Sequence, residues 1–144
     1  YKTKKISKKH VQKITRAVHE INSSPFMKDI SLYIDSGGFQ VAMGAVQTKD
    51  MPNFMDTYYN FLEKEQDQYK YAFMLDMPPG PGSGEIFKSY QQVEELNRMS
   101  YQKAALLPQA VKDKIVYIHH FRSPSLYKTW SKFWNRWYCC FLGY

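Results

Sequence analysis

The chain has 144 residues, of which 44% are hydrophobic and 23% charged, a composition typical of one folded domain and not of a disordered segment. No apolar run of about 18 residues occurs, so we expect no membrane span and a cytoplasmic location. The chain carries 20 Lys and Arg against 13 Asp and Glu. This excess favours a polyanionic partner such as nucleic acid, although a solvated basic surface would give the same count.

The ends of the chain and its cysteines suggest its context. The sequence begins at Tyr1 without a methionine and stops within an apolar stretch at Tyr144, so we expect a piece of a longer protein. Cys139 and Cys140 are adjacent, which is typical of a reduced, intracellular protein. Their spacing does not match a zinc site, and we predict no metal site in this chain.

The first half of the chain predicts a helix and then two strands separated by a helix. Residues 1–29 form a basic N-terminal region with a helix from about Lys8 to Asn22, followed by a short strand at Ile30–Ile34. A second helix begins at Asp50-Met-Pro52, with proline in its first turn. Its expected apolar stripe consists of Phe54, Tyr58, Phe61 and Leu62. A second strand is expected at Tyr71–Leu75.

The second half repeats this alternation. It predicts a helix over about Glu85–Leu107, a strand at Lys114–Ile118, a helix after Ser123-Pro124 and a fourth strand within Tyr138–Leu142. Strands that alternate with helices and are apolar on both faces indicate a parallel α/β fold. Residues 30–144 are therefore interpreted as consecutive βα units.

A residue capable of chemistry stands where each of the first three strands is expected to end: Asp35, Asp76 and His119. In a (β/α) barrel the carboxyl ends of the strands converge on one active site. A doubly wound open sheet also binds ligands at its strand ends, so this pattern alone allows either fold.

The most informative segment is Asp35-Ser36-Gly37-Gly38-Phe39-Gln40. A carboxylate at a strand end is followed by two glycines that allow the backbone to turn closely around a ligand. The phenylalanine offers a face for stacking on a planar base, and the glutamine offers both a donor and an acceptor. A tight turn with a capping aspartate would explain the same residues without any function.

This hexapeptide resembles the signature of the tRNA-guanine transglycosylase family, which includes archaeal and phage DNA-modifying branches. In that family a second Asp ends the next barrel strand, and Tyr71-Ala-Phe-Met-Leu-Asp76-Met-Pro78 is similar to that segment. The following strand ends in a Gln that helps to read the base, and His119 takes its place here. The resemblance covers about Ile30 to Tyr144 and favours a divergent, phage-type or DNA-modifying member.

The resemblance implies that residues 1–144 form roughly the first half of a (β/α)8 TIM-type barrel. It implies a pentosyltransferase that replaces guanine in tRNA or DNA by a 7-deazaguanine base through retaining double displacement, a logic shared with retaining glycosidases. Asp35 would be the acid/base and Asp76 would accept hydrogen bonds from the base. The remaining substrate contacts would come from Ser36, Gly37, Gly38, Phe39, Gln40 and His119.

The same resemblance places two parts of the family's machinery outside this chain. Its nucleophilic Asp and its zinc site would both follow Tyr144, so no cofactor is expected here and the chain alone is expected not to turn over. We also expect the missing barrel half or a partner chain. Two other functions fit the residues: a non-catalytic nucleic-acid-binding or assembly protein that retains a partial barrel, and a sugar or nucleoside hydrolase that uses Asp35 and Asp76 as its carboxylate pair.

Overall fold

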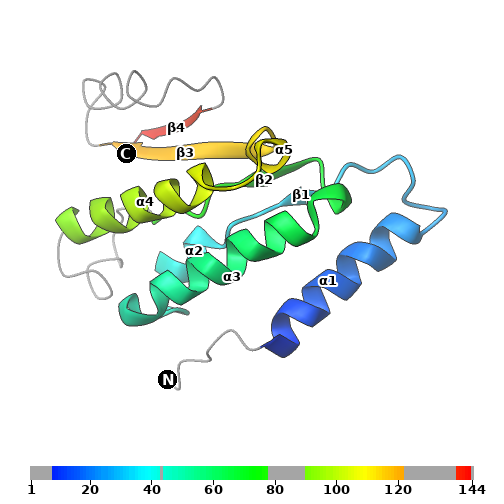
Figure 1. The fold of residues 1–144 in the computed structure, drawn as a ribbon, viewed down its shortest axis with the longest axis horizontal. Coiled ribbons are helices and arrows are strands. Elements are labelled where there is room, and N and C mark those ends of the chain that lie inside the picture. The colour runs from blue at the N-terminus through cyan, green and yellow to red at the C-terminus, as the bar shows by residue number, and fades with distance from the viewer. Residues whose placement is uncertain (1–7, 43, 78–89, 122–138, 144) are drawn as a thin grey trace.

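The computed structural model describes residues 8–42, 44–77, 90–121 and 139–143 (Figure 1). The elements, in chain order, are α1 (Lys8–Ser23), β1 (Tyr33–Ile34), α2 (Gly38–Ala42), the 3-10 turn η1 (Thr48–Asp50), α3 (Met51–Lys64), the 3-10 turn η2 (Gln66–Gln68), β2 (Tyr71–Phe73), α4 (Tyr90–Ala105), α5 (Gln109–Lys112), β3 (Ile115–Phe121) and β4 (Cys139–Gly143). Within the described ranges, none of the helices has the length and apolar character that a membrane crossing requires.

The strands form one parallel sheet in the order β1-β2-β3-β4. Ile34 pairs with Ala72, and Ala72 in turn pairs with Ile115, so the register is continuous across the first three strands. Each strand therefore lies beside the strand that precedes it in the sequence. The sheet is open in the described part of the chain, and closure into a barrel stays a prediction.

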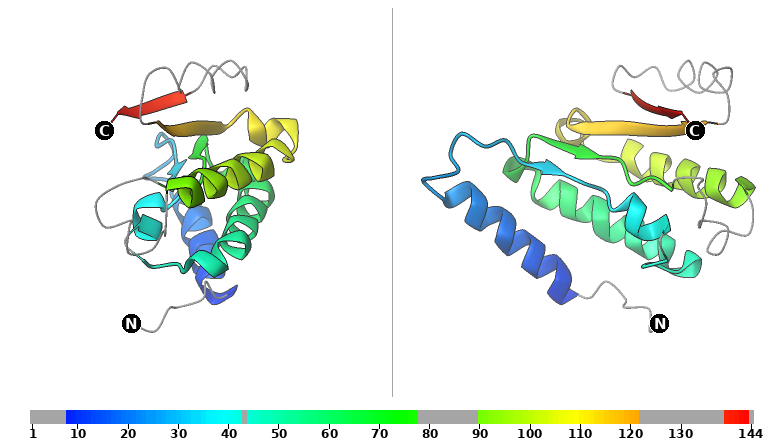
Figure 2. Two further views of the ribbon diagram at one scale, coloured as in Figure 1. Left: turned by 90° about the vertical axis from the view of Figure 1, so that its left-hand side faces the viewer. Right: turned by 180° about the vertical axis from the view of Figure 1, so that it is seen from behind.

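The core lies between the sheet and helices α3 and α4, which run side by side along it (Figures 1 and 2). The sheet contributes Ala72, Ile115 and Tyr117, which are almost completely buried in the same cluster as residues of both helices. The ring of Tyr117 lies 5.2 Å from that of Tyr101 on α4, measured between centroids.

The buried stripe of α3 differs from the one expected from the sequence. Met51, Met55, Tyr59 and Leu62 are the buried residues of this helix. Of the four residues expected, only Leu62 belongs to that set, because Phe54, Tyr58 and Phe61 are partly buried at the edge of the core. The helix is apolar on two neighbouring stripes, and hydrophobicity alone does not show which of them faces the sheet.

The predicted starts of α1 and α3 are confirmed, and β4 lies where the fourth strand was expected. α4 ends at Ala105, two residues before the predicted end at Leu107, and the predicted start at Glu85 lies outside the described residues. The sequence did not predict the short helices α2 and α5. β1 and β2 are shorter than predicted, at 2 and 3 residues. β3 is longer and includes His119, which was wrongly expected to follow it, and the helix expected after Pro124 lies outside the described residues.

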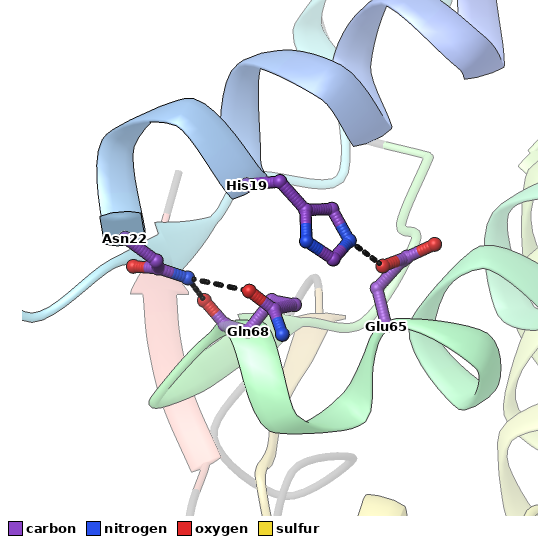
Figure 3. A network of polar contacts seen from close by, with 4 residues as sticks. All are labelled: His19, Asn22, Glu65 and Gln68. Carbon is purple, nitrogen blue, oxygen red and sulfur yellow. Dashed lines mark hydrogen bonds and ion pairs between the residues drawn. The ribbon is translucent and has the colours of Figure 1, made fainter. Parts of the chain in front are cut away.

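Helix α1 is attached to the rest of the domain by polar contacts with the end of α3 and with η2 (Figure 3). The imidazole Nε2 of His19 lies 2.7 Å from Oε2 of Glu65, whose side chain is 6% exposed. The Asn22 amide donates to the carbonyl oxygen of Gln68 at 2.7 Å and to its side-chain oxygen at 3.1 Å. Val18 of the same helix is buried, whereas Ile14 is 53% exposed, so both polar and apolar contacts attach α1.

Replacing Leu62 with alanine is expected to lower the free energy of unfolding by about 2–5 kcal/mol, because the side chain is completely buried and its loss leaves a cavity. The matched control is Leu106→Ala, since Leu106 is 86% exposed and its loss is expected to change stability by no more than about 0.5 kcal/mol. Urea titration of both variants measures the difference. Equal effects of the two substitutions would contradict the core described above.

Candidate active site

The Asp-Ser-Gly-Gly segment forms the turn from β1 into α2. β1 ends at Ile34 and α2 begins at Gly38, so three residues connect a strand to a helix. Gly37 has a φ of +75°, in the left-handed region that glycine adopts without strain. Its carbonyl oxygen accepts a hydrogen bond from the backbone N–H of Val41 at 3.1 Å, which closes the first turn of the helix. The first glycine of the pair is therefore required by the turn itself.

The turn is joined to the loop after β2 by a buried hydrogen bond. The hydroxyl of Ser36 donates to Oδ1 of Asp76 at 3.2 Å, and the two residues are 4% and 7% exposed. The backbone N–H of Gly38 donates to the same Ser36 oxygen at 3.4 Å. Two of the residues singled out in the sequence, 40 positions apart, thus lie in contact at the carboxyl ends of neighbouring strands.

The second glycine is required by a different constraint. A Cβ atom at Gly38 would lie 2.6 Å from the carbonyl oxygen of Asp76 and 2.7 Å from its Oδ1. Real Cβ contacts are essentially never shorter than 3.0 Å. The start of α2 therefore packs directly against Asp76, and only glycine permits that distance. A plain turn would need Gly37, but it would not need Gly38.

Asp35 and Gln40 are exposed and line an open pocket of about 510 Å³ between α1, the turn and α3. Most of its other lining side chains are apolar or aromatic, including Ile14, Phe54 and Phe61. Ser36 also lines it, whereas Asp76 is not among the described residues that do so. The structure therefore brings Asp35, Ser36 and Gln40 to one pocket, and Ser36 connects that pocket to the buried carboxylate of Asp76.

Tyr58 is a further residue of this pocket, which the sequence did not indicate as part of the site. Its hydroxyl donates to the carbonyl oxygen of Phe73 at 2.6 Å, and its ring lines the same pocket as Asp35. Burial raises the pKa of Tyr58 well above the ordinary value of 10, and the charges of neighbouring groups, Asp35 and Asp76 among them, raise it further. Both carboxylates therefore act electrostatically on one neutral phenol. The sequence pattern predicts Tyr58 only as part of an apolar stripe. Helical periodicity counts a tyrosine as an apolar ring and does not show where its hydroxyl group bonds.

The remaining predicted site residues are described only by their backbone. Phe39 lies within α2, and His119 lies within β3, opposite Phe141 of β4. Phe73 pairs with Val116; Asp76 follows Phe73 by three residues, as His119 follows Val116. The side chains of both lie outside the described part of the structure, so their predicted roles in stacking and base reading stay predictions.

Over the described ranges there is no group of three or more His, Cys, Asp and Glu side chains that could hold a metal ion. Comparison with protein families, with curated proteins and with solved structures gave no match for this chain.

Replacing Ser36 with alanine is expected to lower any activity of this site about 10-fold and stability by roughly 1 kcal/mol, because the buried carboxylate of Asp76 loses a hydrogen-bond donor. Ser23→Ala is the control, since the Ser23 hydroxyl makes a bond of the same length, 3.2 Å, to the Glu20 carbonyl at the surface. Activity and urea unfolding are measured for both. If Ser36→Ala behaves like Ser23→Ala, Ser36 does not hold the Asp76 carboxylate in place.

Proposed function

We propose that this chain is part of a base-exchange enzyme that replaces guanine in a nucleic acid by a 7-deazaguanine base. The observation that carries the proposal is the contact of Ser36 and Gly38 with Asp76. A turn motif that is similar to the transglycosylase signature lies against the one carboxylate that the same resemblance assigns to base recognition. A tight turn with a capping aspartate and no function would require neither this contact nor the close approach at Gly38.

The sheet topology supports the corresponding fold. Neighbouring strands follow the order of the sequence, β1-β2-β3-β4, as consecutive units of a (β/α) barrel do. Doubly wound sheets instead reverse their order at the point where ligands bind. Half of an eight-stranded barrel leaves two strand edges to be paired. We therefore expect another part of the protein or a partner chain to complete the barrel beside β1, where Tyr33 is 51% exposed.

The proposed reaction proceeds by two displacements at the anomeric carbon. A carboxylate outside this chain bonds to that carbon while the glycosidic bond to guanine breaks, and the bonding electron pair stays with guanine. Asp35 donates a proton to the departing base. The incoming base returns a proton to Asp35 as its nitrogen bonds to the anomeric carbon and the carboxylate leaves. The polymer backbone stays intact throughout.

The position of Asp35 suits its proposed role. Asp35 is exposed at an open pocket, where a proton donor can reach an arriving or departing base. Asp76 is buried behind this pocket and bonded to Ser36, so its proposed hydrogen bonds to the base require the base to reach past Ser36. The target nucleotide has to leave its stack to reach such a site, and the net charge of +7 favours binding of its phosphates.

The deciding experiment incubates the full-length protein with radiolabelled guanine, and separately with a labelled 7-deazaguanine base, using tRNA and duplex DNA as alternative acceptors. Label that enters one polymer without strand cleavage would establish base exchange and identify the acceptor. Release of free guanine without incorporation would instead indicate a nucleoside hydrolase. Binding of nucleic acid with neither release nor incorporation would favour the non-catalytic binding or assembly protein.

A further inference from the structure

The backbone immediately before Asp76 is bonded by two buried side chains. The backbone N–H of Leu75 donates to the hydroxyl oxygen of Tyr59 at 3.3 Å, and the hydroxyl of Ser100 donates to the carbonyl oxygen of Leu75. The oxygens of Tyr59 and Ser100 are 2.7 Å apart. Because the Ser100 hydroxyl donates its proton to the Leu75 carbonyl oxygen, the Tyr59 hydroxyl is the donor in the bond between Tyr59 and Ser100. The arrangement is a closed ring in which both hydroxyl groups and both backbone groups of Leu75 are satisfied.

The backbone immediately after Asp76 is bonded in an analogous way by one side chain of α4. The N–H of Met77 donates to Oδ1 of Asn97 at 2.7 Å, and Nδ2 of Asn97 donates to the carbonyl oxygen of Met77 at 3.0 Å. The side-chain amide of Asn97 thus forms with Met77 the same pair of hydrogen bonds that the backbone of a neighbouring strand would form. Both neighbours of Asp76 in the chain are therefore held by their N–H and C=O groups, beyond the last residue of β2 at Phe73.

The hydroxyl groups of Tyr59 and Ser100 lie in a part of the core that apolar side chains of similar size could fill. Tyr59 is 3% exposed and Ser100 is completely buried, between α3 and α4. A phenylalanine and an alanine would fill nearly the same space, and burying a hydroxyl costs free energy unless it is hydrogen bonded. Fully satisfied polar networks in a core make the local structure rigid and unique. Tyr59 and Ser100 bond to the backbone of Leu75, so the segment that they make rigid is the backbone next to Asp76.

We propose that Tyr59, Ser100 and Asn97 are positioning residues that fix the backbone on both sides of Asp76 and thereby aim its carboxylate. The role assigned to the aimed carboxylate, recognition of the base, depends on the base exchange proposed above. Asp76 is then held from three directions: by the ring at Leu75, by the amide at Met77, and by Ser36 and Gly38 on the turn after β1. Displacement of a positioned group by about 1 Å can lower a rate about 100-fold, so such support has a large effect on activity.

The test compares Tyr59→Phe, Ser100→Ala and Asn97→Asp with the matched control Tyr69→Phe in the full-length protein. Tyr69 is 5% exposed, and its hydroxyl donates to the Leu62 carbonyl oxygen at 2.9 Å; Tyr69 precedes β2, whereas Asp76 follows it. The control therefore removes the same kind of buried bond without touching Leu75 or Met77. Asn97 is only partly buried, so its variant is expected to fold even if the two core variants do not.

Two readouts are taken for each folded variant. The first is the hydrogen-exchange rate of the backbone N–H of Asp76, which reports local opening of the backbone at that position. The second is kcat/KM for the labelled free base. The three positioning variants are expected to speed this exchange and to lose about 10-fold or more in kcat/KM, whereas Tyr69→Phe stays within about twofold of the wild type on both.

The two readouts separate the two proposals. An exchange rate at Asp76 that is unchanged in Asn97→Asp and in every other folded positioning variant would overturn the positioning role, whatever activity the protein has. A rate that rises in these variants but not in Tyr69→Phe, in a protein that transfers no base, would establish the positioning of Asp76 and refute base exchange. Equal losses in Tyr69→Phe and the positioning variants would show a general effect on stability and would also overturn the proposal.

Discussion

Asp35→Asn is expected to lower the rate of base exchange by about 100- to 10,000-fold, the contribution typical of a positioned general acid or base. The amide has nearly the shape of the carboxylate but cannot exchange a proton with the departing or incoming base. Because Asp35 is exposed, the free energy of unfolding is expected to change by no more than about 0.5 kcal/mol. Incorporation of labelled base and urea unfolding are measured on the same preparations.

The matched control for this prediction is Asp29→Asn. Asp29 is also exposed, but it precedes β1 and is not among the residues that line the pocket of Asp35. Its amide variant is expected to keep the wild-type rate. If Asp35→Asn also exchanges bases at the wild-type rate, the proton transfer has to be assigned to another group.

Gly38→Ala is expected to slow base exchange about 100-fold and to destabilise the protein by about 1–3 kcal/mol, because the added Cβ forces α2 away from Asp76. The closest atoms are the backbone carbonyl oxygen of Asp76 at 2.6 Å and its carboxylate oxygen at 2.7 Å. A backbone atom cannot move aside by rotating, so the turn and the carboxylate have to separate. Activity and urea unfolding of the variant measure the two effects.

The neighbouring glycine supplies the contrast. At Gly37 a Cβ would meet only Oε1 of Gln40, at an ordinary 3.5 Å, and asparagine tolerates the left-handed φ of +75° better than alanine does. Gly37→Asn is therefore expected to lose less activity and less stability than Gly38→Ala. Should both glycine variants lose activity equally, the close approach at Gly38 would not be the reason for the second glycine.

The positions of the helices followed from local chemistry. α1 has apolar residues at helical spacing, and Pro52 lies in the first turn of α3, where its missing N–H costs nothing. The strands were less well predicted, since the length of a strand depends on the partner with which it pairs. β1 therefore begins only at Tyr33, and β2 ends at Phe73 although its apolar run continues to Leu75, whereas β3 extends through His119, where it pairs with β4.

The site shows the same division between local pattern and tertiary contact. The sequence by itself determined that Asp35 and Asp76 follow two strands and that two glycines follow Asp35, because strand ends and turn residues are local patterns. Only the tertiary structure decided that Ser36 bonds to Asp76, that Gly38 packs against it, and that Tyr59, Ser100 and Asn97 hold its neighbours. These contacts join residues from 16 to 41 positions apart. Their distances depend on how three separate elements pack, and hydrophobic periodicity within one element carries no information on that packing.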